Sequence, residues 1–136
     1  MEPVEKTDRK NISSIETFFD SLLRGKDKLT ENLYFGELPV ELKKDWKDIV
    51  VVDCGNPLRD ENAYAAGTVI ILLYVKQNPY GTKDVKRMQE LEKALNRLVR
   101  ENDDPYYHLS FRGRYTNYNA VNDIFMNVVQ LNLVIT

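Results

Sequence analysis

The sequence predicts an α+β domain, with two helices packed on one face of a mainly antiparallel sheet of about four strands. Two segments repeat apolar residues every three or four positions, which is the spacing of one helix face. Four others are β-branched runs or alternate apolar with polar residues, as strands do. The expected order is helix, a short optional strand, two strands, helix and two strands, which is typical of α+β domains.

Length and composition set limits on the class of protein. The 136 residues fit one domain, 1–136, in which 1–11 is expected to form a charged, mobile tail. A net charge of -2 from 19 basic and 21 acidic side chains makes nucleic-acid and membrane partners unexpected. Cys54 is the single cysteine, so no internal disulfide forms, and a cytosolic setting fits. No signal peptide or membrane-spanning run is visible.

The first helix is expected over residues 14–24. Ser13 and Glu16 have the spacing of a capping box, and Gly25 can take the left-handed conformation that ends a helix. The apolar stripe of this helix consists of Ile15, Phe18, Phe19, Leu22 and Leu23.

The segment that follows is the least regular part of the sequence. Leu33–Phe35 reads as a short strand closed by Gly36, and residues 40–46 read as a helical turn or an irregular stretch. We interpret Trp46 as a core or lid residue rather than as a binding platform.

Two strands are expected in the middle of the chain. Ile49–Val52 is a β-branched run, and Thr68–Val75 is apolar on both faces, as in a strand at the centre of a sheet. The polar stretch Gly55–Gly67 between them predicts a long loop, and such loops are often functional.

The second helix is expected from Thr82, as its cap, to about Glu101, where the approach to Pro105 ends it. Its apolar face consists of Val85, Met88, Leu91, Leu95, Leu98 and Val99. Alternation then predicts a strand over residues 107–112 and a last strand over 124–136. The polar stretch Gly113–Asp123 between them predicts a second long connection.

The sequence contains few residues for catalysis or metal binding. One histidine, His108, and one cysteine, Cys54, cannot supply the usual zinc ligands, and nothing in the sequence places them side by side. The acidic pairs lack the spacing of a calcium loop. We therefore expect no catalytic, cofactor or metal site, and a protein that is not an enzyme.

One enzymatic alternative remains open. The segment order also resembles the core of restriction-endonuclease-like nucleases, in which carboxylates and a lysine on adjacent strands hold a divalent metal. Asp53 and Lys76 match two of these positions, but Tyr74 stands where the second carboxylate belongs. A nuclease that has diverged from this pattern is therefore the alternative.

Tyrosine and arginine give the remaining signal, with eight tyrosines in the chain. This pair is favoured at protein interfaces, also stacks on single-stranded nucleic acid, and can simply stabilise a sheet by cross-strand packing. A small adaptor that binds a peptide along a sheet edge is a further alternative. The candidate interaction residues are Arg59, Tyr64, Arg112, Arg114, Tyr115 and Tyr118.

The order of segments resembles the tail-terminator and tail-completion group of phage minor tail proteins. The matching segments are Ser14–Phe19, Ile49–Asp53, Thr68–Val75, Leu91–Leu95 and Val129–Ile135. In that group an N-terminal helix, strands and a long helix precede a last strand that closes the sheet. Residues 26–48 depart from the pattern.

The resemblance implies a structural protein encoded by a phage or prophage. Such a protein forms a homo-oligomeric ring, typically hexameric, at the head-proximal end of the tail tube. It stops tube polymerisation and meets the head connector, so its partners are itself, the tail-tube protein and the connector protein. It is assembled in the bacterial cytoplasm and then belongs to the virion. The stretches Gly55–Gly67 and Gly113–Asp123 are the expected contact sites.

Overall fold

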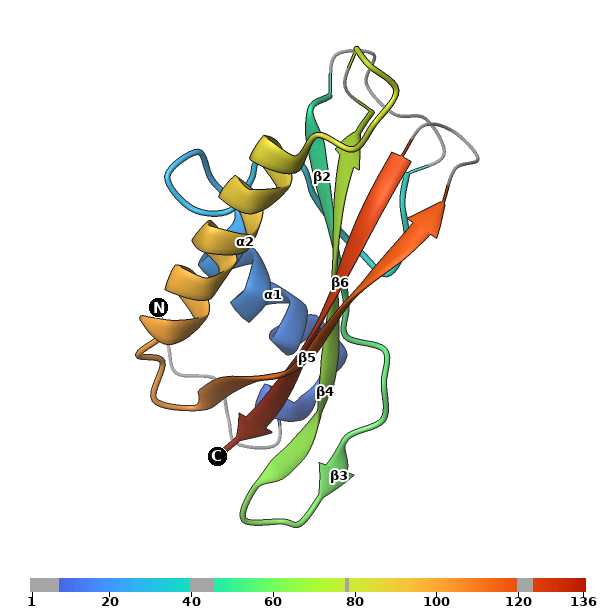
Figure 1. The fold of residues 1–136 in the computed structure, drawn as a ribbon. Coiled ribbons are helices and arrows are strands. Elements are labelled where there is room, and N and C mark those ends of the chain that lie inside the picture. The colour runs from blue at the N-terminus through green and yellow to red at the C-terminus, as the bar shows by residue number, and fades with distance from the viewer. Residues whose placement is uncertain (1–7, 40–45, 78, 120–123) are drawn as a thin grey trace.

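A computed structural model describes residues 8–39, 46–77, 79–119 and 124–136, with only the backbone described for 117–119. Both helices lie on the same side of a twisted sheet (Figure 1). In chain order the elements are η1 (Asp8–Lys10), α1 (Ile12–Leu23), β1 (Leu33–Phe35), β2 (Asp48–Asp53), β3 (Arg59–Asp60), β4 (Ala65–Lys76), α2 (Val85–Arg100), β5 (Tyr107–Asn119) and β6 (Ile124–Ile135).

The sheet has the order β1-β2-β4-β6-β5, and β3 pairs with β4 off this path. All neighbours are antiparallel except β1 and β2, which are parallel. The α+β class and the mainly antiparallel sheet are therefore confirmed. The expectation of about four strands is wrong, because the sheet has six strands and is mixed. Strand β3 consists of two exposed charged residues, so it has no apolar pattern from which a strand could be predicted.

The main core lies between the helices and the inner face of the sheet. Ile15, Phe19 and Leu23 of α1 are buried there. They pack in one cluster with Met88, Leu91, Leu95 and Val99 of α2 and with the inward residues of β2, β4, β5 and β6. Removing this apolar surface from water is the main source of stability.

The outer face of the sheet is covered in part. Trp46 is 9% exposed and packs with Ile49 and Val51 of β2, which confirms its interpretation as a core residue. The Lys76 ammonium lies 4.9 Å from the centroid of the Trp46 ring. Along β4 the inner side chains are buried and the outer ones are half-buried, so the strand is central but its two faces differ. The expected turn at 40–45 lies outside the described residues.

The helix starts differ from the expected caps. Helix α1 begins at Ile12 after Asn11, and no side-chain cap is formed at this described end, so the predicted capping box is wrong. In α2 the side chain of Asp84, not of Thr82, accepts the backbone N–H of Arg87 at 3.1 Å. Asp84 directly precedes Val85, the first residue of α2, so its side chain can reach the unpaired backbone N–H groups of the first turn.

The first predicted loop contains a β-hairpin. Arg59 pairs with Ala66 and Asp60 with Ala65, so β4 begins before the expected Thr68. The turn is made by Asn62, whose φ of 65° is in the left-handed region that asparagine tolerates. Figure 1 shows this hairpin projecting beyond the helices at one end of the sheet.

The second predicted loop is largely strand. β5 continues to Asn119, where the expected strand stopped near Arg112. Phe111 pairs with Leu131 but Gly113 pairs with Gln130, so Arg112 is the extra residue of a β-bulge. An extra residue reverses the alternation of side chains between the two faces. A single alternating pattern therefore does not predict that the strand continues past Arg112.

The residues before α1 contact the end of the sheet. Asp8–Lys10, which the sequence assigned to the tail, form a 3₁₀ turn. The carbonyl oxygen of Arg9 accepts the hydroxyl of Tyr107 at 2.8 Å, and the Lys10 ammonium lies 2.6 Å from a carboxylate oxygen of Asp60. Residues 1–7 of the expected tail lie outside the described ranges.

The two helix starts give a direct stability test. Asp84→Ala should lower the free energy of unfolding by about 1 kcal/mol, since it removes the acceptor for the Arg87 N–H. Ser13→Ala should change it by less than about 0.5 kcal/mol. Urea denaturation followed by circular dichroism measures both, and equal losses would contradict the observed capping.

Candidate functional site

The candidate residues of the last two strands do not form one cluster. Arg112 lies on the outer face, where its Nη1 donates to the hydroxyl of Thr68 at 2.7 Å. Arg114 lies on the helix face, where its Nη2 donates to the side-chain oxygen of Asn96 at 2.7 Å. The bulge between Phe111 and Gly113 places these two candidate residues on opposite faces of the sheet.

The tyrosines are also distributed. Tyr115 pairs with Val128 on the outer face and is 53% exposed. Tyr118 pairs with Phe125 through its backbone, and its side chain lies outside the described part. Arg112 and Tyr115 together are called the outer-face patch below.

Arg59 and Tyr64 lie on the hairpin formed by β3 and β4 and are called the hairpin patch. Tyr64 is 38% exposed, and the Arg59 guanidinium forms an exposed ion pair with Glu61 at 3.1 Å. The hairpin is at the Ala65 end of β4, whereas Tyr115 is level with Leu72. At about 3.3 Å per residue, Tyr115 lies roughly 23 Å from the hairpin along the strand direction, and Arg112, which contacts Thr68, lies roughly 10 Å from it.

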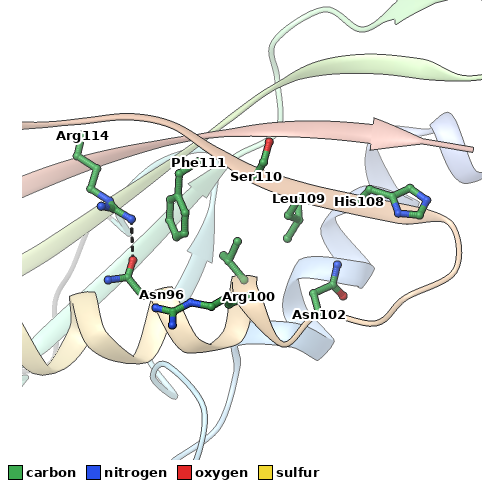
Figure 2. Close-up of a pocket in the computed structure, with 9 residues that line it drawn as sticks. Asn96, Arg100, Asn102, His108, Leu109, Ser110, Phe111 and Arg114 are labelled. Carbon is green, nitrogen blue, oxygen red and sulfur yellow. Dashed lines mark hydrogen bonds between the residues drawn. The ribbon is translucent and has the colours of Figure 1, made fainter.

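A basic groove, which sequence reasoning did not identify, separates the end of α2 from β5. It has a volume of about 560 Å³ and is lined by Asn96, Val99, Arg100, Asn102, His108, Leu109, Ser110, Phe111 and Arg114. Figure 2 shows Leu109 and Phe111 pointing from β5 toward α2. The Arg114 guanidinium lies 4.1 Å from the centroid of the Phe111 ring. This lining contains two arginines and no carboxylate.

A buried ionic network was also missed. The Asp48 carboxylate is almost fully buried. It accepts hydrogen bonds from Thr30 Oγ1 at 2.7 Å and from Arg87 Nε at 2.7 Å. Burial acts to lower the pKa of Arg87, but hydrogen bonds to Glu90 and Asp48 outweigh it and raise that pKa above its usual value. The network connects β2, α2 and the segment between α1 and β1.

The residues of the nuclease alternative are not brought together. Asp53 pairs with Ile70, which is six positions before Lys76 on β4, so roughly 20 Å of strand separates them. The Asp53 carboxylate instead accepts the backbone N–H of Gly55 at 2.9 Å. Tyr74 is half-buried, and burial raises the pKa of its phenol.

Cys54 and His108 are likewise apart. Cys54 directly follows β2, His108 is on β5, and β4 and β6 lie between these two strands. Burial, with the charges of Glu16 and Asp53, raises the pKa of the Cys54 thiol to about 12. His108 is exposed, with Nε2 3.1 Å from the hydroxyl of Thr136.

Comparisons with known proteins leave the family open. No protein-family model matches the sequence, and no curated protein matches it. Among the described residues, no three His, Cys, Asp or Glu side chains are grouped so that they could hold a metal ion. No described helix has the length and apolar character needed to cross a membrane.

The buried network predicts a large effect of a single substitution. Arg87→Met should lower the free energy of unfolding by about 3 kcal/mol, because it leaves the Asp48 carboxylate buried without its cation. Urea denaturation followed by Trp46 fluorescence measures this. Arg97→Met is the control, since Arg97 makes an exposed bond to the carbonyl of Asp27. Losses of the same size in both variants would contradict the importance of the buried pair.

The Cys54 thiol should be unreactive in the folded protein. A pKa of about 12 instead of 9.0 leaves roughly a thousandfold less thiolate at pH 8, and burial blocks access to it. A chromogenic disulfide reagent should therefore label the native protein slowly and the urea-unfolded protein fast, with Cys54→Ser as the blank.

The same pKa sets a pH dependence. The thiol stays neutral in the folded protein up to about pH 12, but in the unfolded chain it ionises above pH 9.0. The stabilisation that comes from burying the neutral thiol is therefore complete below pH 9.0, and it falls as the pH rises toward about 12. The difference in stability between the native protein and Cys54→Ser should therefore shrink over this range. Rapid labelling of the native protein at pH 8 contradicts the assignment.

Proposed function

We propose that this chain is a structural protein of a phage or prophage tail, which forms a ring of the terminator or completion type at the head–tail junction. The order of its elements supports the proposal, because a helix, strands and a long helix precede a last strand inserted into the sheet. In the phage group that the sequence resembles, the last strand likewise closes the sheet. The proposal assigns no reaction to the chain.

The observation that carries the proposal is the presence of two exposed tyrosine–arginine patches at separate places on one sheet. A ring requires a head-to-tail contact between two different surfaces, repeated until it closes. The hairpin patch projects from one end of the sheet, and Tyr115 of the outer-face patch lies roughly 23 Å along the strands from it. One protomer can therefore offer its hairpin to the outer face of the next.

The side chains of the two patches suit this role. A tyrosine ring buries a large apolar area while its hydroxyl keeps a hydrogen-bonding partner, and arginine adds directional hydrogen bonds. Tyr64 and Tyr115 are both among the exposed large apolar side chains. In the proposal the other partners are the tail-tube and head-connector proteins, met in the bacterial cytoplasm and retained in the virion.

Complementation between two variants tests the head-to-tail contact. Tyr64→Asp and Tyr115→Asp each place a charge in one patch and should each reduce the ring to monomers by light scattering. Mixed together, they should form a heterodimer and nothing larger, because each variant retains the patch that the other has lost. Tyr80→Asp is the matched control at an exposed tyrosine outside both patches and should leave the ring intact.

Two results contradict the proposal. One is a wild-type protein that stays monomeric at all concentrations, both alone and with the tail-tube protein encoded in the same genome. The other is a symmetric dimer that only one of the two variants disrupts.

A further inference from the structure

The sheet has one capped edge and one open edge. At β1 the guanidinium of Arg24 donates to the backbone carbonyl oxygens of Glu31 at 3.0 Å and Leu33 at 2.9 Å. These bonds occupy the outer side of β1, since the backbone of Asn32 and Gly36 bonds to β2.

At the other end of the sheet, β5 pairs only with β6 within the described ranges. The outward N–H of Tyr107 is bonded to the Asp104 carboxylate at 3.0 Å, and its C=O is bonded to the Asn102 amide at 2.9 Å. The outward groups available to another strand are therefore those of Leu109 and Phe111.

The bulge at Arg112 limits the regular part of this open edge to Tyr107–Phe111. The same run supplies His108, Leu109, Ser110 and Phe111 to the wall of the basic groove. The opposite wall is the last turns of α2 (Figure 2). The open strand edge and the groove therefore coincide.

The charged side chains that line the groove are the two arginines, Arg100 and Arg114. Arg100 is exposed and forms no ion pair or hydrogen bond with any described residue. Arg114 uses one donor on Asn96 and keeps others, since a guanidinium has five N–H donors. Leu109 and Phe111 are half-buried and form an apolar floor between the two arginines. A carboxylate here would meet two cations and no competing acid of the lining.

We propose that this groove binds an extended, acidic segment of a partner protein, which adds a strand to the edge of β5. Backbone hydrogen bonds to the outward groups of Leu109 and Phe111 supply affinity, and side chains at every second position supply specificity. On the side that faces α2, acidic residues meet Arg100 and Arg114, and apolar residues cover Leu109 and Phe111. This site requires neither of the two patches used for the ring, so it stands independently of the proposed function.

The probe is a fluorescein-labelled heptapeptide that alternates Glu and Val, and fluorescence anisotropy measures its binding to the full chain. Binding should weaken with salt, and Arg100→Ala should weaken it about tenfold by removing one charge-assisted hydrogen bond. Lys86→Ala is the control for charge alone, because Lys86 is exposed on α2 and roughly 21 Å from Arg100 along the helix axis. It should leave binding unchanged.

Two further peptides separate strand addition from simple charge attraction. A Lys–Val peptide of the same length should not bind, and a Glu–Val peptide methylated at alternate backbone nitrogens should lose its binding. Hydrogen exchange should slow at the outward amides of Leu109 and Phe111 when the Glu–Val peptide is present.

Three outcomes overturn the proposal: equal binding of the Lys–Val peptide, unchanged binding by Arg100→Ala, or unchanged amide exchange along β5. A fourth outcome also overturns it: a second copy of the chain protects the same amides, and the peptide does not displace that copy. The edge of β5 would then serve self-association. Arg100→Ala should still form rings, so failure of the groove and failure of the ring can be told apart.

Discussion

The central position of β4 is the constraint on which the rest of the structure depends. One edge of β4 is occupied by β2 and the other, along its whole length, by β6. Because β6 is the last strand in sequence, the sheet is complete only when residues 124–135 have entered between β4 and β5. The inward side chains of β4 then form the surface on which both helices pack. β5 is left at the open edge, and β3 folds back on the start of β4 as a projecting hairpin.

The elements that bury apolar surface could be predicted from the sequence, and the elements held by backbone pairing alone could not. Helix α2 and strands β4 and β6 repeat apolar residues at the period of their own geometry, because one face of each meets the core. Strand β3 and the end of β5 are polar. They are held by backbone hydrogen bonds, which do not depend on the type of side chain and so produce no pattern in the sequence. The cap of α2 was missed for a local reason, since Thr82 and Asp84 both carry a suitable oxygen.

The candidate site shows the same division at the level of single residues. Arg112 and Arg114 are two positions apart, which in a regular strand places both side chains on one face, but a single bulge places them on opposite faces. The Asp48–Arg87 pair and the groove between Arg100 and Arg114 join residues that are distant in sequence, so no local pattern could indicate them. Of the tyrosines that the sequence singled out, Tyr64 and Tyr115 are exposed, and their role stays a prediction.

The bulge at Arg112 determines two of the three surfaces through which the chain is proposed to act, the outer-face patch and the basic groove. Without the extra residue the alternation of β5 would continue unchanged past Phe111, because side chains alternate strictly along a regular strand. Tyr115 would then face α2, and Arg114 would lie on the outer face with no access to Asn96. The groove would lose one of its two cations, and the outer-face patch would lose its aromatic ring. One irregular residue in an edge strand therefore supplies an aromatic contact on one side of the sheet and a basic groove on the other.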